Sequence, residues 1–267
     1  MKGLNKYFGV IYNTIAESSE FRINHIFSFL TIALPLIFMI FLWKKVYTDI
    51  NVIQNFSLSS IITYYFLVIL IQDITYPGVN FEIVEDIKEG RLSIILTKPI
   101  SYPIYIFSIK IGVSLPYFLI SLMILSIFLF IIKENLVLPV DLCMGFIFLL
   151  VFFLSFVLGF LLSFILSIFS FWIEEGGGLE KLTDVLIPIL SGLILPLSFF
   201  PSFIHPFFKI LPFKYTLNFP VEVFLGILPF QKILEGIIFQ IAWIFISLLV
   251  SCLLWKRGLK HYKAIGG

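Results

Sequence analysis

Residues 80–101 read NFEIVEDIKEGRLSIILTKPIS and carry seven charged side chains between two long apolar runs. Four acids recur at spacings of three and four, so on a helix they share one face: Glu82, Glu85, Asp86 and Glu89. Apolar residues fall on another side and make the predicted helix amphipathic: Ile83, Val84 and Ile87. Gly90 stands where a left-handed helix cap is cheap, and Lys98-Pro99 ends the segment. We expect such a helix, placed between two apolar runs, to bind a partner.

The composition indicates a membrane protein built from helices. Apolar residues make up 60% of the 267-residue chain and charged residues 13%, and the mean hydropathy is +1.09. A soluble domain is roughly half apolar and about a quarter charged. Several uncharged runs reach the roughly 20 residues that a helix needs to cross the hydrocarbon core. The expected fold class is therefore all-α and polytopic. The net charge of +2 is too small to imply a nucleic-acid partner.

We predict six transmembrane helices from the uncharged runs of the sequence. The fourth run is longer than the bilayer is thick, so it should tilt, bend near Gly159 or project into water. Four prolines make one straight helix through the fifth run implausible. The six runs are Ile23–Trp43, Ile50–Gln72, Ile111–Ile132, Leu142–Ile173, Val185–Phe208 and Gly236–Trp255.

Two further segments complete the predicted domain organisation. Residues 1–22 place apolar side chains at helical spacing, which favours an amphipathic helix in the membrane interface over a soluble capping helix. Residues from about 198 to 235 are too apolar for a solvated loop, yet contain five prolines. Short re-entrant helices fit this composition, because backbone groups at membrane depth must be paired; an aromatic loop on the membrane surface is the alternative. Residues 23–267 then form a single transmembrane domain that contains residues 80–101.

The distribution of Lys and Arg predicts the orientation. With the N-terminus in the cytoplasm, 12 of the 18 basic residues fall in cytoplasmic segments and six fall outside. Cytoplasmic loops of membrane proteins carry an excess of Lys and Arg. We therefore predict a multi-pass protein of the cytoplasmic membrane with both termini, and residues 80–101, in the cytoplasm.

The sequence shows no energy source of its own. The triple glycine at residues 176–178 is followed by Leu179-Glu180-Lys181, which does not match a phosphate-binding P-loop. The three histidines lie too far apart in the predicted topology to share a metal ion. The spans are nearly free of charge, which disfavours ion-driven transport. Asp73 and Lys110 are exceptions, and both are expected near the cytoplasmic ends, where snorkelling is easy. We expect energy to enter from another polypeptide through residues 80–101.

Four segments, in order and covering nearly the whole chain, resemble the membrane subunit of type-2 ATP-binding cassette (ABC) exporters, in particular a bacterial subgroup of poorly defined substrate. They are Phe21-Arg22-Ile23-Asn24 at the first span; Asp86–Leu92 with Lys98-Pro99-Ile100; Leu211-Pro212-Phe213 with Phe219-Pro220-Val221 and Phe224-Leu225-Gly226; and Trp255–Leu259 with Tyr262-Lys263-Ala264 and Gly266-Gly267.

The resemblance implies six transmembrane helices, an N-terminal interface helix, a cytoplasmic coupling helix and re-entrant helices before the last span. Two such permease subunits, identical or paralogous, would form the translocation path and be powered by separate cytoplasmic ABC ATPase subunits. This chain would bind no cofactor or metal, and the partner subunit would use the ATP. The coupling residues would be Glu82, Ile83, Glu85, Asp86, Ile87, Glu89, Gly90 and Arg91.

Within the predicted coupling helix, Ile83, Val84 and Ile87 would anchor one face and the four acids would contact the ATPase. Two other functions remain open from the sequence. One is an integral membrane enzyme that acts on lipid or polyprenyl substrates, which would need acid, base or metal-ligating groups gathered at one depth. The other is a non-transporting scaffold within an envelope complex.

Overall fold

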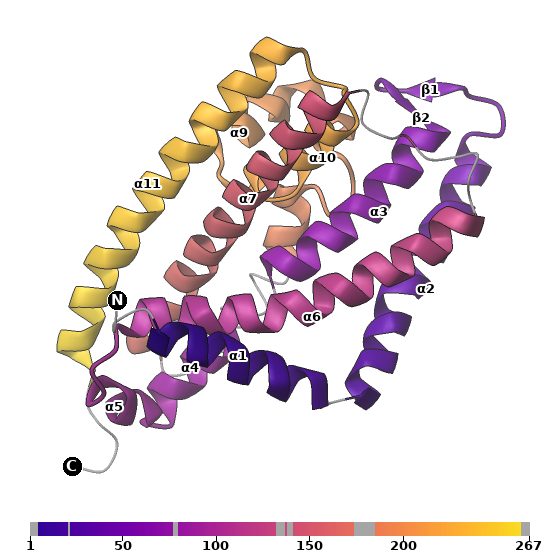
Figure 1. Ribbon diagram of the computed structural model, residues 1–267. Helices are drawn as coiled ribbons and strands as arrows, with labels where there is room; N and C mark the ends of the chain where they lie inside the picture. The colour runs from indigo at the N-terminus through magenta and orange to yellow at the C-terminus, as the bar shows by residue number, and fades with distance from the viewer. Residues whose placement is uncertain are drawn as a thin grey trace.

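The computed structural model describes residues 5–20, 22–76, 80–131, 137, 141–173 and 185–262. In these ranges the protein is a bundle of long helices with short helices gathered at both of its ends (Figure 1). The long helices are α1 (Asn5–Glu20), α2 (Arg22–Val46), α3 (Leu58–Thr75), α6 (Tyr102–Ile131), α7 (Leu142–Ile168) and α11 (Phe230–His261). The all-α fold class that the composition predicts is confirmed.

Four helices in the described part of the chain are long and apolar enough to cross a membrane: Leu58–Thr75, Tyr102–Met123, Leu142–Phe171 and Phe230–His261. Several bounds differ from the predicted runs. The third predicted run begins at Ile111, but its helix, α6, begins at Tyr102. The sixth predicted run is Gly236–Trp255, but its helix, α11, extends from Phe230 to His261. The predicted uncharged runs stop next to or near Lys110, Lys232 and Lys256, but a charge does not end a helix when neighbouring turns continue its hydrogen bonds.

The second predicted span, Ile50–Gln72, is wrong at its start. A small hairpin of β1 (Val52–Ile53) and β2 (Phe56–Ser57) precedes α3, and its two turn residues, Gln54 and Asn55, have φ values of 47° and 69°. A two-residue turn with both φ values positive suits the twist of paired strands. The Ser57 hydroxyl then accepts a hydrogen bond from the Ser60 N–H and caps α3. Hydropathy alone could not separate this apolar hairpin from the helix that follows it.

Close helix contacts in the bundle depend on glycines. Gly112 of α6 lies against α1, where an added Cβ would come within 2.7 Å of the Thr14 Cβ. Gly236 of α11 faces the ring of Phe219, and Gly258 faces the ring of Phe171. Small residues let helix backbones approach closely in membranes, where packing rather than the hydrophobic effect drives association. Helix α1 rests on α6 in this way, and the place of residues 1–22 in the membrane interface stays a prediction.

The fifth predicted run, Val185–Phe208, is not one straight helix. Residues 185–191 are helical, Gly192 has a φ of 88°, and short helices follow. They are η3 (Leu197–Phe199), η4 (Ser202–Ile204), α9 (His205–Ile210), η5 (Phe213–Tyr215) and α10 (Asn218–Phe224). The Asn218 Oδ1 atom accepts hydrogen bonds from the Tyr64 hydroxyl, at 3.0 Å, and from the Leu197 N–H, at 3.1 Å. These buried bonds hold the broken segment against α3.

Candidate functional site

Residues 80–101 fold into two short helices, where the sequence had predicted one. These are α4 (Asn80–Lys88) and α5 (Arg91–Leu96), and Gly90 between them has a φ of 75°. This left-handed conformation is cheap for glycine because it has no Cβ. The predicted left-handed cap at Gly90 is therefore confirmed, and α5 is an addition to the prediction. We call residues 80–96 the α4–α5 hairpin.

The apolar face of the α4–α5 hairpin is buried against the helical bundle. Ile83, Ile87 and Leu92 are 1%, 6% and 0% exposed. They belong to one apolar cluster with buried side chains of α6 and α7 and with partly buried side chains of α11. Figure 1 shows the hairpin beneath the ends of these helices. The predicted anchoring role of Ile83 and Ile87 agrees with this burial, and Val84 is half-buried.

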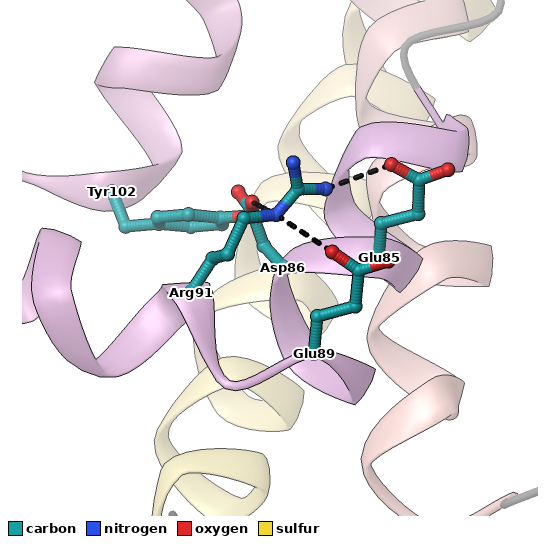
Figure 2. Close-up of polar contacts among 5 residues, drawn as sticks. All are labelled: Glu85, Asp86, Glu89, Arg91 and Tyr102. Carbon is teal, nitrogen blue, oxygen red and sulfur yellow. Dashed lines mark hydrogen bonds and ion pairs between the residues drawn. The ribbon is translucent and has the colours of Figure 1, made fainter.

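The polar face of the hairpin is organised by Arg91 (Figure 2). The Arg91 guanidinium lies 2.7 Å from the Glu85 carboxylate and 3.4 Å from that of Glu89. Both acids remain more than half exposed, at 58% and 61% of their side-chain areas, and Glu82 is exposed as well. The hydrogen bond from Arg91 to Glu85 raises the pKa of the guanidinium. Exposed pairs of this kind contribute little stability, typically about 0–1 kcal/mol each.

Asp86 does not lie on the open face with the other acids, so the acidic face predicted from the spacing lacks this member; the predicted contact of Asp86 with the ATPase stays a prediction. The residue is buried, at 8% exposure, and its Oδ2 atom accepts a 2.9 Å hydrogen bond from the Tyr102 hydroxyl. Arg91 Nε lies 3.3 Å from the other carboxylate oxygen. Burial raises the pKa of Asp86, while Tyr102 and Arg91 oppose that shift. Asp86 therefore connects the hairpin to α6 inside the protein.

The hairpin is connected to α11 directly through Ser93 and indirectly through Tyr102 of α6. The Tyr102 ring stacks on the Trp255 ring, with centroids 5.0 Å apart and planes at 3°. The Ser93 hydroxyl of α5 lies 2.9 Å from the Tyr262 hydroxyl, just after the end of α11. These residues were not predicted from the sequence, since their partners are more than 150 positions away. Tyrosine and tryptophan at the ends of apolar runs were the available signal.

The segment after the hairpin is held by α1. The Ser101 N–H donates to the Tyr7 hydroxyl at 2.9 Å, and the Lys6 ammonium donates to the Pro99 carbonyl. The hairpin is thus attached to α6, α7 and α11, the segment that follows it is attached to α1, and the acidic surface of the hairpin is open.

Lys110 does not snorkel to water, contrary to the prediction. It is 1% exposed, and its Nζ atom donates a 2.6 Å hydrogen bond to the Thr75 carbonyl at the end of α3. The ammonium also lies 4.8 Å from the centre of the Phe156 ring. The last carbonyls of a helix lack partners within the helix and carry partial negative charge. Lys110 therefore caps α3 immediately before the chain continues to the hairpin.

Replacing Lys110 with methionine should lower the free energy of unfolding by about 1–3 kcal/mol, because a buried carbonyl loses its donor. Methionine keeps most of the volume, so a cavity contributes little. Thermal unfolding in detergent would measure the change, with Lys256→Met, an exposed lysine on α11, as the control. A more stable Lys110→Met variant would contradict the capping role, because the cost of burying the ammonium would then dominate.

Comparison with known protein families identifies the family of this chain. A family model described as ABC-2 family transporter protein matches residues 33–266, most of the chain and all of the hairpin. The chain belongs to this family. A search of curated proteins found no significant match. The ABC-2 membership makes the chain a membrane permease of an ABC transporter, and a transport subunit rather than an enzyme.

Proposed function

We propose that this chain is the permease subunit of an ABC exporter, that it forms the translocation path with a second permease subunit, and that the α4–α5 hairpin receives motion from a cytoplasmic ABC ATPase. In this proposal the permease binds no cofactor and the ATPase subunits bind the ATP. The observation that carries the proposal is the hairpin itself, in a chain of the ABC-2 family. One of its faces is buried in the bundle, and the other presents acids and apolar side chains outward.

The open surface of the hairpin has the composition of a docking site. Glu82, Glu85 and Glu89 are exposed on the hairpin, and on α5 two large apolar side chains are exposed as well, Ile94 at 63% and Leu96 at 42%. Protein interfaces commonly combine an apolar centre with a charged rim. A protein partner of basic character would satisfy both features.

The buried contacts of the hairpin supply a path for motion. Asp86 bonds to Tyr102 at the start of α6, and Tyr102 stacks on Trp255 of α11. A rigid displacement of the hairpin would therefore move two of the long helices together, as in shear-type transitions. ATP-driven closure of two ATPase subunits would shift the spans between inward and outward access in this way.

Affinity purification of the chain from its native membrane in mild detergent tests the partner assignment. We expect an ABC ATPase and either a second copy or a paralogous permease in the purified complex. Deleting residues 91–96 from the hairpin should remove the ATPase and leave the second permease, provided that the variant still elutes as a single species. An intact chain that purifies without any ATPase would contradict the proposal.

The proposed topology has six spans, both termini in the cytoplasm and the segment from about 198 to 235 re-entrant from the outer side. It places Cys143, an exposed residue in the first turn of α7, at the outer surface. A membrane-impermeant maleimide should therefore label Cys143 in intact cells. The matched control is the Cys143→Ser variant, whose remaining cysteine is Cys252. Cys252 lies among apolar residues on α11, so this variant should not be labelled. Labelling that requires broken cells would reverse the orientation.

A further inference from the structure

Helices α9 and α10 and the start of α11 lie at the end of the molecule opposite the α4–α5 hairpin (Figure 1). Charged side chains of these helices line a chamber between them. Its volume is about 360 Å³, within the range of roughly 300–1,000 Å³ that small-molecule sites occupy. Seven of the side chains that line it are titratable: His205, Lys209, Lys214, Tyr215, Glu222, Lys232 and Glu235. The proposed coupling function uses none of them.

Glu222 is the feature that points to a ligand. The residue is 6% exposed, and its Oε2 atom has no hydrogen-bond partner among the described residues. Lys214 Nζ lies 3.7 Å from this oxygen, which gives attraction but is too long for a hydrogen bond. The hydroxyl of Ser198 also lines the chamber and is also buried without a partner among the described residues. Buried polar atoms are costly unless they are hydrogen-bonded.

The position of the chamber indicates a lipid as the ligand. Along η4 and α9, Phe203, Phe207 and Ile210 are 79%, 58% and 65% exposed. His205, Phe208 and Lys209 of the same segment line the chamber instead. Apolar and aromatic side chains exposed beside polar ones are typical of a helix at the boundary between headgroups and acyl chains. A chamber on the polar side of that helix then lies at headgroup depth.

The charges of the chamber limit which kind of lipid headgroup could bind there. A purely anionic group would be repelled by the buried Glu222 carboxylate, and a purely cationic one by three lysines. A headgroup with both charges avoids either penalty. A primary ammonium also has three N–H donors that could reach a carboxylate, whereas a trimethylammonium has none. We propose that the chamber binds the zwitterionic headgroup of an amine-bearing phospholipid, with the ammonium at Glu222 and the phosphate at Lys209 and Lys232.

Native mass spectrometry of the full chain in detergent tests this assignment, with phosphatidylethanolamine, phosphatidylcholine and phosphatidylglycerol of identical acyl chains as probes. We expect phosphatidylethanolamine to be retained about tenfold better than phosphatidylcholine, the ratio expected for one charge-assisted hydrogen bond. Glu222→Gln should bring that ratio close to one. Glu17→Gln, an exposed acid on α1, is the matched control and should leave the ratio unchanged. Free phosphoethanolamine, which lacks acyl chains, should not compete.

A second variant keeps the proposal testable if Glu222→Gln fails to fold. Lys232 is exposed at the mouth of the chamber, and Lys232→Gln should lower the retention of phosphatidylethanolamine and phosphatidylcholine by a similar factor. Equal retention of the two lipids by the wild-type chain would overturn the proposal, and so would a preference for phosphatidylglycerol. Competition by free phosphoethanolamine would overturn the lipid assignment and make the occupant a soluble zwitterion. These outcomes do not depend on an ATPase, so they are distinct from a failure of the proposed coupling.

Discussion

Reversing two charges on the open face of the α4–α5 hairpin, in the double variant Glu85→Lys with Glu89→Lys, is expected to lower transport-coupled ATP hydrolysis at least tenfold. Like charges placed across an interface cost several kcal/mol, and each 1.4 kcal/mol changes an equilibrium tenfold. Both side chains are more than half exposed, so the change acts on the open surface and leaves the buried side chains of the hairpin unchanged.

The measurement for the charge reversal is ATP hydrolysis and co-purification of the ATPase in the purified complex. Because the two new lysines would stand next to Arg91, the neutral pair Glu85→Gln with Glu89→Gln separates loss of a partner contact from local repulsion. The matched control is Glu17→Lys, which reverses an exposed acid on α1. Full coupled hydrolysis in the charge-reversed complex would show that the acidic face does not contact the ATPase.

Replacing Gly159 with alanine is expected to lower the free energy of unfolding by about 1–3 kcal/mol, the usual cost of overpacking. A Cβ at this position would lie 2.1 Å from the Thr75 Cγ2 atom and 3.1 Å from the Thr75 carbonyl oxygen. Thr75 is the last residue of α3 and the acceptor of the Lys110 hydrogen bond. The clash therefore displaces the point at which α3 is joined to α6 and α7, close to the start of the hairpin.

A compensating change distinguishes this clash from a general effect of alanine. Thr75→Ser removes the Cγ2 atom and should recover a large part of the stability that Gly159→Ala loses. Gly145→Ala is the control on the same helix, because nothing lies within 4 Å of its added Cβ; it should be neutral or stabilising, by up to about 1 kcal/mol from helix propensity. Thermal unfolding of Gly159→Ala, Thr75→Ser, the double variant of these two and Gly145→Ala gives the comparison. Equal effects of Gly145→Ala and Gly159→Ala would contradict the contact with Thr75.

The amino-acid sequence by itself determined the class of protein and the place of the amphipathic helix α4. Uncharged runs of about 20 residues leave a chain no alternative to helices in a membrane, because unpaired backbone groups are too costly there. The spacing of Ile83 and Ile87 determined which face of α4 is buried, and Gly90 marked its left-handed end. These are local properties, set by periodicity and by the conformational freedom of single residues.

The tertiary structure alone decided which polar side chains face inward. Asp86 has the same spacing as the exposed acids, but Tyr102 and Arg91 hold it in the protein. The sequence predicts that Lys110 snorkels to water, but in the structure its ammonium donates to the carbonyl at the end of α3. Nothing in the sequence marks Glu222 as a ligand contact. It is a candidate because α10 is buried and leaves the Oε2 atom without a hydrogen-bond partner among the described residues. Each of these depends on contacts between different helices, which no local periodicity encodes.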